Sequence, residues 1–88
     1  MSAVTQKKLT FDFAAVVREH QAGVWRYLRF LGADQTEADD LTQETFLALL
    51  RAHEKGSFSY QGSEATWGYL RQVARNQLLQ RRRKQAAR

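Results

Sequence analysis

The sequence predicts an all-α fold, a compact bundle of three main helices in one small domain. Its 88 residues contain no proline, so no helix is interrupted from within by that residue. Apolar residues recur at spacings of three and four in three separate segments, as they do on the buried face of an α-helix. No segment shows the apolar–polar alternation that is typical of a strand. With 43% hydrophobic residues the chain can bury one core, but it is too short for two.

The first helix is predicted to follow a flexible lead at residues 1–10 and to open a helical domain over residues 11–80. Gly32 comes directly after its apolar face, and glycine is the preferred residue just past a helix end. A break at Gly23 would divide the segment and give the bundle a fourth helix. The histidine on the apolar face is expected to be packed. That face consists of Phe13, Val17, His20, Val24, Leu28 and Leu31.

The second helix is expected to pack antiparallel to the first, because the loop over residues 32–35 is short. Thr36 is a plausible N-cap, with acidic residues in the first turn, where the helix dipole favours anions. The apolar pattern fades after His53. A loop with two aromatic residues, Phe58 and Tyr60, follows over residues 54–64. The predicted core face is Ala38, Leu41, Thr45, Ala48, Leu49 and Ala52.

The third helix is predicted to start near Glu64, with Ser63 as its N-cap. Core packing should end near Leu78, because the wheel places Arg81 next on the same face. Residues 81–88 are then a solvated basic extension, helical or frayed. The predicted apolar face is Trp67, Leu70, Val73, Ala74 and Leu78.

Charges are segregated along the chain, although the net charge is only +5. Five acids and no base lie from Asp34 to Glu44, and seven bases and no acid follow Glu64. Soluble domains usually intersperse their charges, so two single-sign patches suggest two different partners. The basic patch suits a phosphate backbone. The acidic patch would repel nucleic acid and suits a protein.

The second helix carries an acidic and polar stripe opposite its core face. An ordinary interpretation is a solvated surface. Leu47 in its middle favours protein docking instead, because an apolar centre rimmed by polar groups is typical of an interface. The stripe consists of Asp40, Gln43, Glu44, Leu47 and Arg51.

The third helix presents Tyr69, Gln72, Asn76 and Arg83 opposite its core face, with an adjoining stripe of arginines. Cations suit phosphates, and amide and phenol groups suit base edges. A solvated arginine-rich helix or a membrane-surface helix would have a similar composition. The absence of acids after residue 64 favours nucleic acid. The adjoining stripe is Arg71, Arg75 and Arg82.

Enzymes are the least supported class, and no cofactor or metal site is predicted. The chain has no cysteine, two histidines and no glycine-rich phosphate loop. Asp39 and Asp40 project about 100° apart on a helix, so they do not form an acid–base pair. No apolar run approaches the roughly 20 residues that cross a bilayer, so membrane insertion is not expected.

Two motifs resemble the bacterial sigma factors. Residues 38–46 (Ala-Asp-Asp-Leu-Thr-Gln-Glu-Thr-Phe) resemble the helix that docks on RNA polymerase. Residues 70–76 (Leu-Arg-Gln-Val-Ala-Arg-Asn), followed by the arginines at 81–83, resemble the promoter-reading helix. The order and spacing are similar to region two of the extracytoplasmic-function (ECF) group, from about Phe11 to Lys84.

The resemblance implies a subunit for transcription initiation in the bacterial cytoplasm. The acidic helix would bind the clamp helices of the largest catalytic subunit of core RNA polymerase. Residues 81–88 would begin a linker to a second DNA-binding domain, and an anti-sigma factor is a further implied partner. The polymerase-binding residues would be Asp40, Gln43, Glu44 and Leu47.

The same resemblance implies that the third helix and the preceding loop recognise and melt the promoter element nearest the start site. They would hold an extruded base of the single-stranded non-template strand. The implied DNA-binding residues are Phe58, Tyr60, Gln61, Tyr69, Arg71, Gln72, Arg75, Asn76 and Arg82.

Two other functions remain open on residue chemistry alone. The first is a generic helical DNA-binding domain that does not depend on RNA polymerase, which predicts duplex binding and no role for Asp40 or Leu47. The second is a protein-interaction module whose basic tail binds a membrane or an acidic protein, which predicts no preference for single-stranded promoter DNA.

Overall fold

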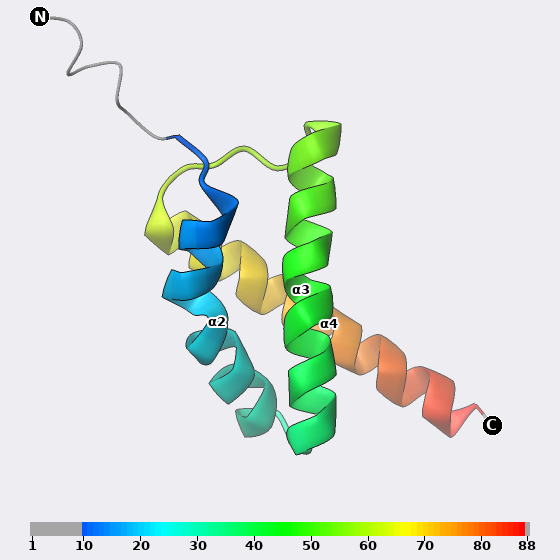
Figure 1. Cartoon of the computed structure of the whole chain (residues 1–88). Helices are drawn as coiled ribbons and strands as arrows, with labels where there is room; N and C mark the ends of the chain where they lie inside the picture. Colours follow the sequence, from blue (N-terminus) through cyan, green and yellow to red (C-terminus); the bar gives the residue numbers. More distant parts are fainter. Residues whose placement is uncertain (1–9, 88) are drawn as a thin grey trace, which may run out of the picture.

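The computed structural model describes residues 10–87, which form three α-helices joined by short connections (Figure 1). They are α2 (Phe13–Phe30), α3 (Gln35–Lys55) and α4 (Ser63–Ala86). No strand occurs in this part of the chain. The predicted all-α class with three main helices is therefore confirmed. The predicted flexible lead lies outside the described residues, apart from Thr10.

Helix α2 is bounded by the residue types that its sequence offers. Asp12 caps its first turn by accepting a backbone N–H. At the other end Gly32 has φ of 106°, a left-handed conformation that glycine adopts without strain. The N–H groups of Gly32 and Ala33 donate to the carbonyls of Arg29 and Leu28, each at 3.0 Å. This pair of hydrogen bonds ends the helix, and it confirms the predicted role of Gly32.

Gly23 does not break the first helix, so the four-helix alternative is wrong. It lies inside α2 where α4 crosses, and a Cβ at this position would meet the Trp67 ring at 3.4 Å. The missing side chain therefore allows a close helix crossing.

The start of α3 corrects the sequence prediction by two residues, because Asp34 and not Thr36 is the N-cap. Asp34 accepts the backbone N–H of Glu37 at 2.8 Å, and Glu37 accepts that of Asp34 at 3.0 Å. This capping box satisfies two backbone donors, whereas a cap at Thr36 would have no such reciprocal partner.

The start of α4 also differs from the prediction. The helix begins at Ser63, and the N-cap is Gly62, which provides no side-chain hydrogen bond. The Ser63 hydroxyl donates to Glu19 of α2 instead. The Gly62 carbonyl accepts hydrogen bonds from both the hydroxyl and the backbone N–H of Thr66, at 2.7 and 3.1 Å, and these two bonds hold the first turn to its N-cap residue.

The three helices enclose one core. Helices α2 and α3 lie antiparallel side by side, as predicted, and α4 crosses behind both (Figure 1). Their buried apolar side chains are Val16, Val24, Leu28, Ala33, Ala38, Leu41, Phe46, Leu49, Leu70, Ala74 and Leu78.

The buried face of α3 is wider than its periodicity predicts. Thr42 and Phe46 are buried in addition to the predicted residues, whereas Ala48 and Ala52 are half-buried. The physical reason is that α3 contacts both other helices, so two adjoining stripes of one helix are covered.

Core packing ends at Leu78, as predicted. Leu78 is 4% exposed, whereas the next residue, Leu79, is 40% exposed. The helix nevertheless continues to Ala86 and projects beyond α3 (Figure 1). The basic extension is thus helical from Arg81 to Ala86, and its last residue lies outside the described part of the chain. None of the described helices has the combination of length and apolar character that crossing a membrane requires.

Candidate functional site

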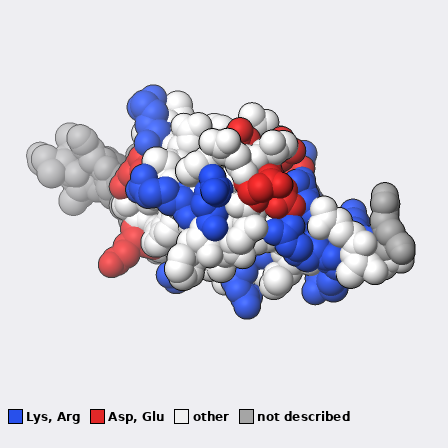
Figure 2. Space-filling model, turned by 90° about the horizontal axis from the view of Figure 1, so that it is seen from below, with Lys and Arg blue, Asp and Glu red and all other residues white. Residues whose placement is uncertain are grey.

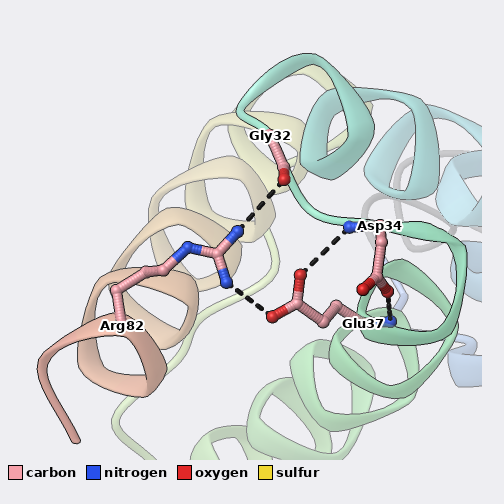
Figure 3. Close-up of polar contacts among 4 residues, drawn as sticks. All are labelled: Gly32, Asp34, Glu37 and Arg82. Carbon is pink, nitrogen blue, oxygen red and sulfur yellow. Dashed lines mark hydrogen bonds and ion pairs between the residues drawn. The ribbon is translucent and has the colours of Figure 1, made fainter. Parts of the chain in front are cut away.

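The N-terminal acids of α3 are engaged within the fold. Figure 3 shows Asp34 and Glu37 in their capping box, with Arg82 of α4 donating to the carboxylate of Glu37. One guanidinium nitrogen of Arg82 donates to Glu37 at 2.5 Å, and the other donates to the carbonyl of Gly32 at 3.0 Å. The acidic segment was predicted to bind a protein and the basic segment to bind nucleic acid, yet Glu37 and Arg82 from these two segments contact each other.

This contact changes the acidity of Glu37. The hydrogen bond from Arg82, and then that from the Asp34 backbone, lower the pKa of the Glu37 carboxyl against the opposing effect of burial. The same hydrogen bond raises the pKa of Arg82. Both shifts favour the charged forms, so the pair is ionised at neutral pH.

Two further acids of α3 also have partners. Asp39 accepts a hydrogen bond from the Trp25 indole Nε1 at 2.8 Å, and the Arg29 guanidinium lies 5.4 Å from the centre of the Trp25 ring. Glu44 forms a longer ion pair with Arg81 of α4, at 3.7 Å.

Asp40 is the acid of this segment that stays unpaired among the described residues. It is exposed beside Gln43, and Leu47 on the same face is 47% exposed. The predicted polymerase-binding residues therefore lie together on the solvent face of α3. Glu44 lies at the edge of this stripe, toward α4.

A groove of about 680 Å³ lies beside the stripe, between α2 and α3. Gln43 and Thr42 line it from α3, and Trp25 and Arg26 line it from α2. The Thr42 hydroxyl is buried there and has no hydrogen-bond partner among the described residues. The exposed α3 stripe is thus continuous with a hollow that has polar and aromatic walls.

The outer face of α4 presents exposed basic and amide side chains. Arg71, Gln72, Arg75 and Asn76 are all exposed, and neither Arg71 nor Arg75 makes an ion pair with any described residue. In the view of Figure 2, acidic side chains lie between basic ones, and further Lys and Arg side chains gather toward the C-terminal end. Arg71 and Arg75 thus differ from Arg81 and Arg82, which form ion pairs with residues of α3.

The aromatic residues of the α3–α4 loop pack against the fold. The centroid of the Phe58 ring lies 4.8 Å from that of Tyr69 and 6.0 Å from that of Phe11. The ring centroids of Tyr60 and Phe11 are 5.8 Å apart. His53 completes the cluster, with its ring 4.1 Å from Phe11. All three predicted DNA-binding aromatic residues are half-buried, whereas the predicted Gln61 is exposed.

A second aromatic contact fixes the α2–α4 crossing. His20 is 8% exposed, and its ring is stacked on that of Trp67, with 6.1 Å between centroids and 14° between planes. The expectation of a packed histidine is confirmed.

Sequence reasoning missed several of these contributors. Phe11 and His53 join the aromatic cluster, and Trp25 holds Asp39. The sole local signal for Phe11 was an apolar residue directly before the Asp12 cap. The other contacts join residues from different helices, which periodicity within one helix does not reveal.

Comparison with known families decides the classification of this all-α chain. The family model described as Sigma-70 region 2 matches residues 16–88. This chain belongs to the sigma-70 region 2 family. The matched residues include all three helices from Val16 onward, and thus both the exposed α3 stripe and the basic face of α4.

Two mycobacterial proteins are similar to this region 2 chain. They are the "Probable RNA polymerase sigma-C factor" of Mycobacterium bovis (strain ATCC BAA-935 / AF2122/97) and the "ECF RNA polymerase sigma factor SigC" of Mycobacterium tuberculosis (strain CDC 1551 / Oshkosh). Each is 43% identical over 53 residues, which cover 60% of this chain and 27% of the relative. No solved structure gives a significant match.

Proposed function

We propose that this chain acts in transcription initiation as the region-two domain of an ECF-type sigma factor. Its α3 stripe binds core RNA polymerase, and its α4 face binds promoter DNA. The observation that supports this most is the separation of two exposed faces on different helices. One is centred on Leu47 beside Asp40, and the other carries the unpaired Arg71 and Arg75. Both partners can therefore bind at the same time.

The α3 stripe is proposed to dock on the clamp helices of the largest polymerase subunit. Leu47 supplies an apolar centre, and Asp40 and Gln43 supply a polar rim, as in a small protein interface. Asp40 is available to a cation of the partner because no described residue pairs with it. An anti-sigma factor that covered the same stripe would compete with the polymerase.

A pull-down with core RNA polymerase tests this docking. Leu47→Asp should abolish binding while helical circular dichroism is unchanged, because it places a charge in the apolar centre. Leu79→Asp is the matched control, since Leu79 is also exposed but lies on α4. Asp40→Ala should weaken binding by roughly 1–3 kcal/mol if its carboxylate pairs with a desolvated cation. Equal binding by all three variants and the parent chain would refute the docking proposal.

The outer face of α4 is proposed to bind the non-template single strand. Arg71 and Arg75 would neutralise phosphates, and Gln72 and Asn76 would contact base edges. The loop would hold an extruded base near the exposed Gln61, close in sequence to the half-buried rings of Phe58 and Tyr60. Extrusion costs a few kcal/mol of stacking, which these contacts must offset.

A fluorescence titration with short labelled DNA tests this surface. The probes are single strands of varied sequence and their matched duplexes, with and without core polymerase. The chain alone should bind weakly, at about 10⁻⁴ to 10⁻⁶ M at physiological salt, because one helix and one loop make a small reading surface. Asn76→Ala should reduce discrimination among sequences without changing the salt dependence. Equal affinity for strand and duplex, with and without polymerase, would favour a generic DNA-binding domain.

A further inference from the structure

We propose that Arg82 is a positioning residue, which fastens the distal part of α4 across the α2–α3 turn and does not itself bind a phosphate. Its effect on DNA binding rests on the proposed function, but the fastening does not. The proposal replaces the assignment of Arg82 to the DNA-binding set.

The geometry occupies both arms of the guanidinium. Nη1 donates to Oε2 of Glu37 at 2.5 Å, and Nη2 donates to the Gly32 carbonyl at 3.0 Å (Figure 3). The two acceptors belong to α3 and to the turn before it. A single side chain thereby joins α4 both to the α2–α3 turn and to the first turn of α3.

The Glu37 carboxylate is held in place independently of Arg82. Oε1 of Glu37 accepts the Asp34 backbone N–H at 3.0 Å, and the Glu37 side chain is only 15% exposed. Exposed ion pairs usually contribute little, because two flexible side chains must both be ordered. Here the capping box has already ordered the carboxylate, and the guanidinium fork matches two fixed acceptors.

The distal part of α4 has few other attachments. Beyond Leu78 the core contacts end, and residues 83–86 are exposed. The remaining ion pair in this part of the helix, between Arg81 and Glu44, is longer at 3.7 Å. Because unattached helix ends open readily, we expect Arg82 to control the order and direction of these last turns.

A phosphate would compete poorly for this guanidinium. A two-armed contact would require the phosphate to displace Glu37 and the Gly32 carbonyl, and a largely covered carboxylate would then lose its partner. A phosphate on the remaining N–H groups would lie beside the Glu37 carboxylate, which repels it. Arg83, the next residue, is exposed, and its side chain makes no ion pair or hydrogen bond among the described residues. Arg83 is therefore the matched control for Arg82.

Hydrogen exchange of the whole chain, without DNA, tests the fastening directly. In Arg82→Ala, amides in residues 79–86 should exchange about threefold to tenfold faster, as expected for loss of a partly exposed charge-assisted contact. Arg82→Lys should resemble Arg82→Ala, because an ammonium cannot reproduce the two-armed contact. Glu37→Gln should have a similar effect, and the double variant Arg82→Ala/Glu37→Gln should add little to either.

The control variant is Arg83→Ala, which should leave the exchange rates of residues 79–86 unchanged. Unchanged exchange in Arg82→Ala would overturn the fastening.

A salt titration of single-stranded DNA binding separates positioning from phosphate contact. A direct contact contributes about 0.7 to the slope of log affinity against log salt. Arg82→Ala should lower the affinity for DNA without lowering that slope. Arg82→Lys should also lower the affinity and leave the slope unchanged. A lower slope in Arg82→Ala, with full affinity restored by Arg82→Lys, would show a phosphate contact and overturn the positioning role. If the parent chain bound no DNA, the proposed function would fail, whereas the exchange result would still decide the fastening.

Discussion

The two halves of α4 are held to the molecule by different forces. Residues 63–78 bury Thr66, Leu70, Ala74 and Leu78 against α2 and α3. Residues 79–86 bury no side chain and are joined to α3 by ion pairs from Arg81 and Arg82. Burying a Leu contributes about 1.5–3 kcal/mol, whereas an exposed ion pair contributes about 0–1 kcal/mol. Apolar burial therefore fixes where α4 crosses, and charge sets how its free end lies.

The largest expected effect is in the proximal half. Leu70 is fully buried, so Leu70→Ala should destabilise the fold by about 2–5 kcal/mol through lost burial and a cavity. Leu79→Ala in the distal half should change stability by no more than about 0.5 kcal/mol. Urea unfolding followed by circular dichroism measures both. Equal losses in the two variants would mean that the halves are not held differently.

Acid should loosen the distal half before the proximal half. The pKa of Glu37 is lowered in the fold, chiefly by the hydrogen bond from Arg82. Such a carboxyl stabilises the fold above its unfolded pKa of about 4.3, and this contribution is lost as pH falls through the lower folded pKa. Protection in residues 79–86, measured by exchange and corrected for the intrinsic pH dependence of exchange, should therefore fall below about pH 4. Glu37→Gln, which cannot titrate, should remove this acid dependence.

Salt dependence should distinguish the arginines of the two halves. Arg75→Ala should lower the slope of single-stranded DNA binding by about 0.7, because this exposed arginine has no ion-pair partner among the described residues. Arg81→Ala should change the slope much less, since its charge faces Glu44. The salt titration with labelled single strands measures both variants. The reverse order would place the phosphate contacts in the distal half.

The smallest expected effect is on stability at Arg81. Its ion pair with Glu44 is 3.7 Å long, and the Glu44 side chain is 53% exposed. Arg81→Ala should therefore cost no more than about 0.5 kcal/mol in urea unfolding. A cost as large as that of Leu70→Ala would contradict the view that charge contributes only weakly to the stability of the distal half.

Much of the fold was predictable from spacing. Periods of three and four located all three helices, the end of core packing at Leu78, and the packed His20. Gly32 was recognised because few other residues adopt a positive φ. The N-cap of α3 was misplaced, since both Asp34 and Thr36 are capping residues. The position of Glu37 three residues after Asp34 decides between them.

The candidate site was predictable in part. The exposed stripe on α3 and the exposed positions on α4 follow from helical geometry alone. The half-buried state of Phe58 and Tyr60 does not, because it depends on Phe11, which is distant in sequence. The burial of Thr42 and Phe46 likewise depends on α3 contacting two helices at once.

The sequence by itself determined the three helices, much of their apolar faces and the segregation of charge, because each depends on residue types at short spacings. It did not determine the whole of each face: Val16 is buried where Val17 was predicted, and α3 also buries Thr42 and Phe46. Tertiary structure alone decided which charges remain free for partners. Arg82 and Glu37 are 45 residues apart and meet because α4 crosses the α2–α3 turn, whereas Arg75 and Asp40 meet no opposite charge in the described fold. The physical reason is that an ion pair requires contact within a few ångströms, which the crossing of helices sets and the order of residues does not.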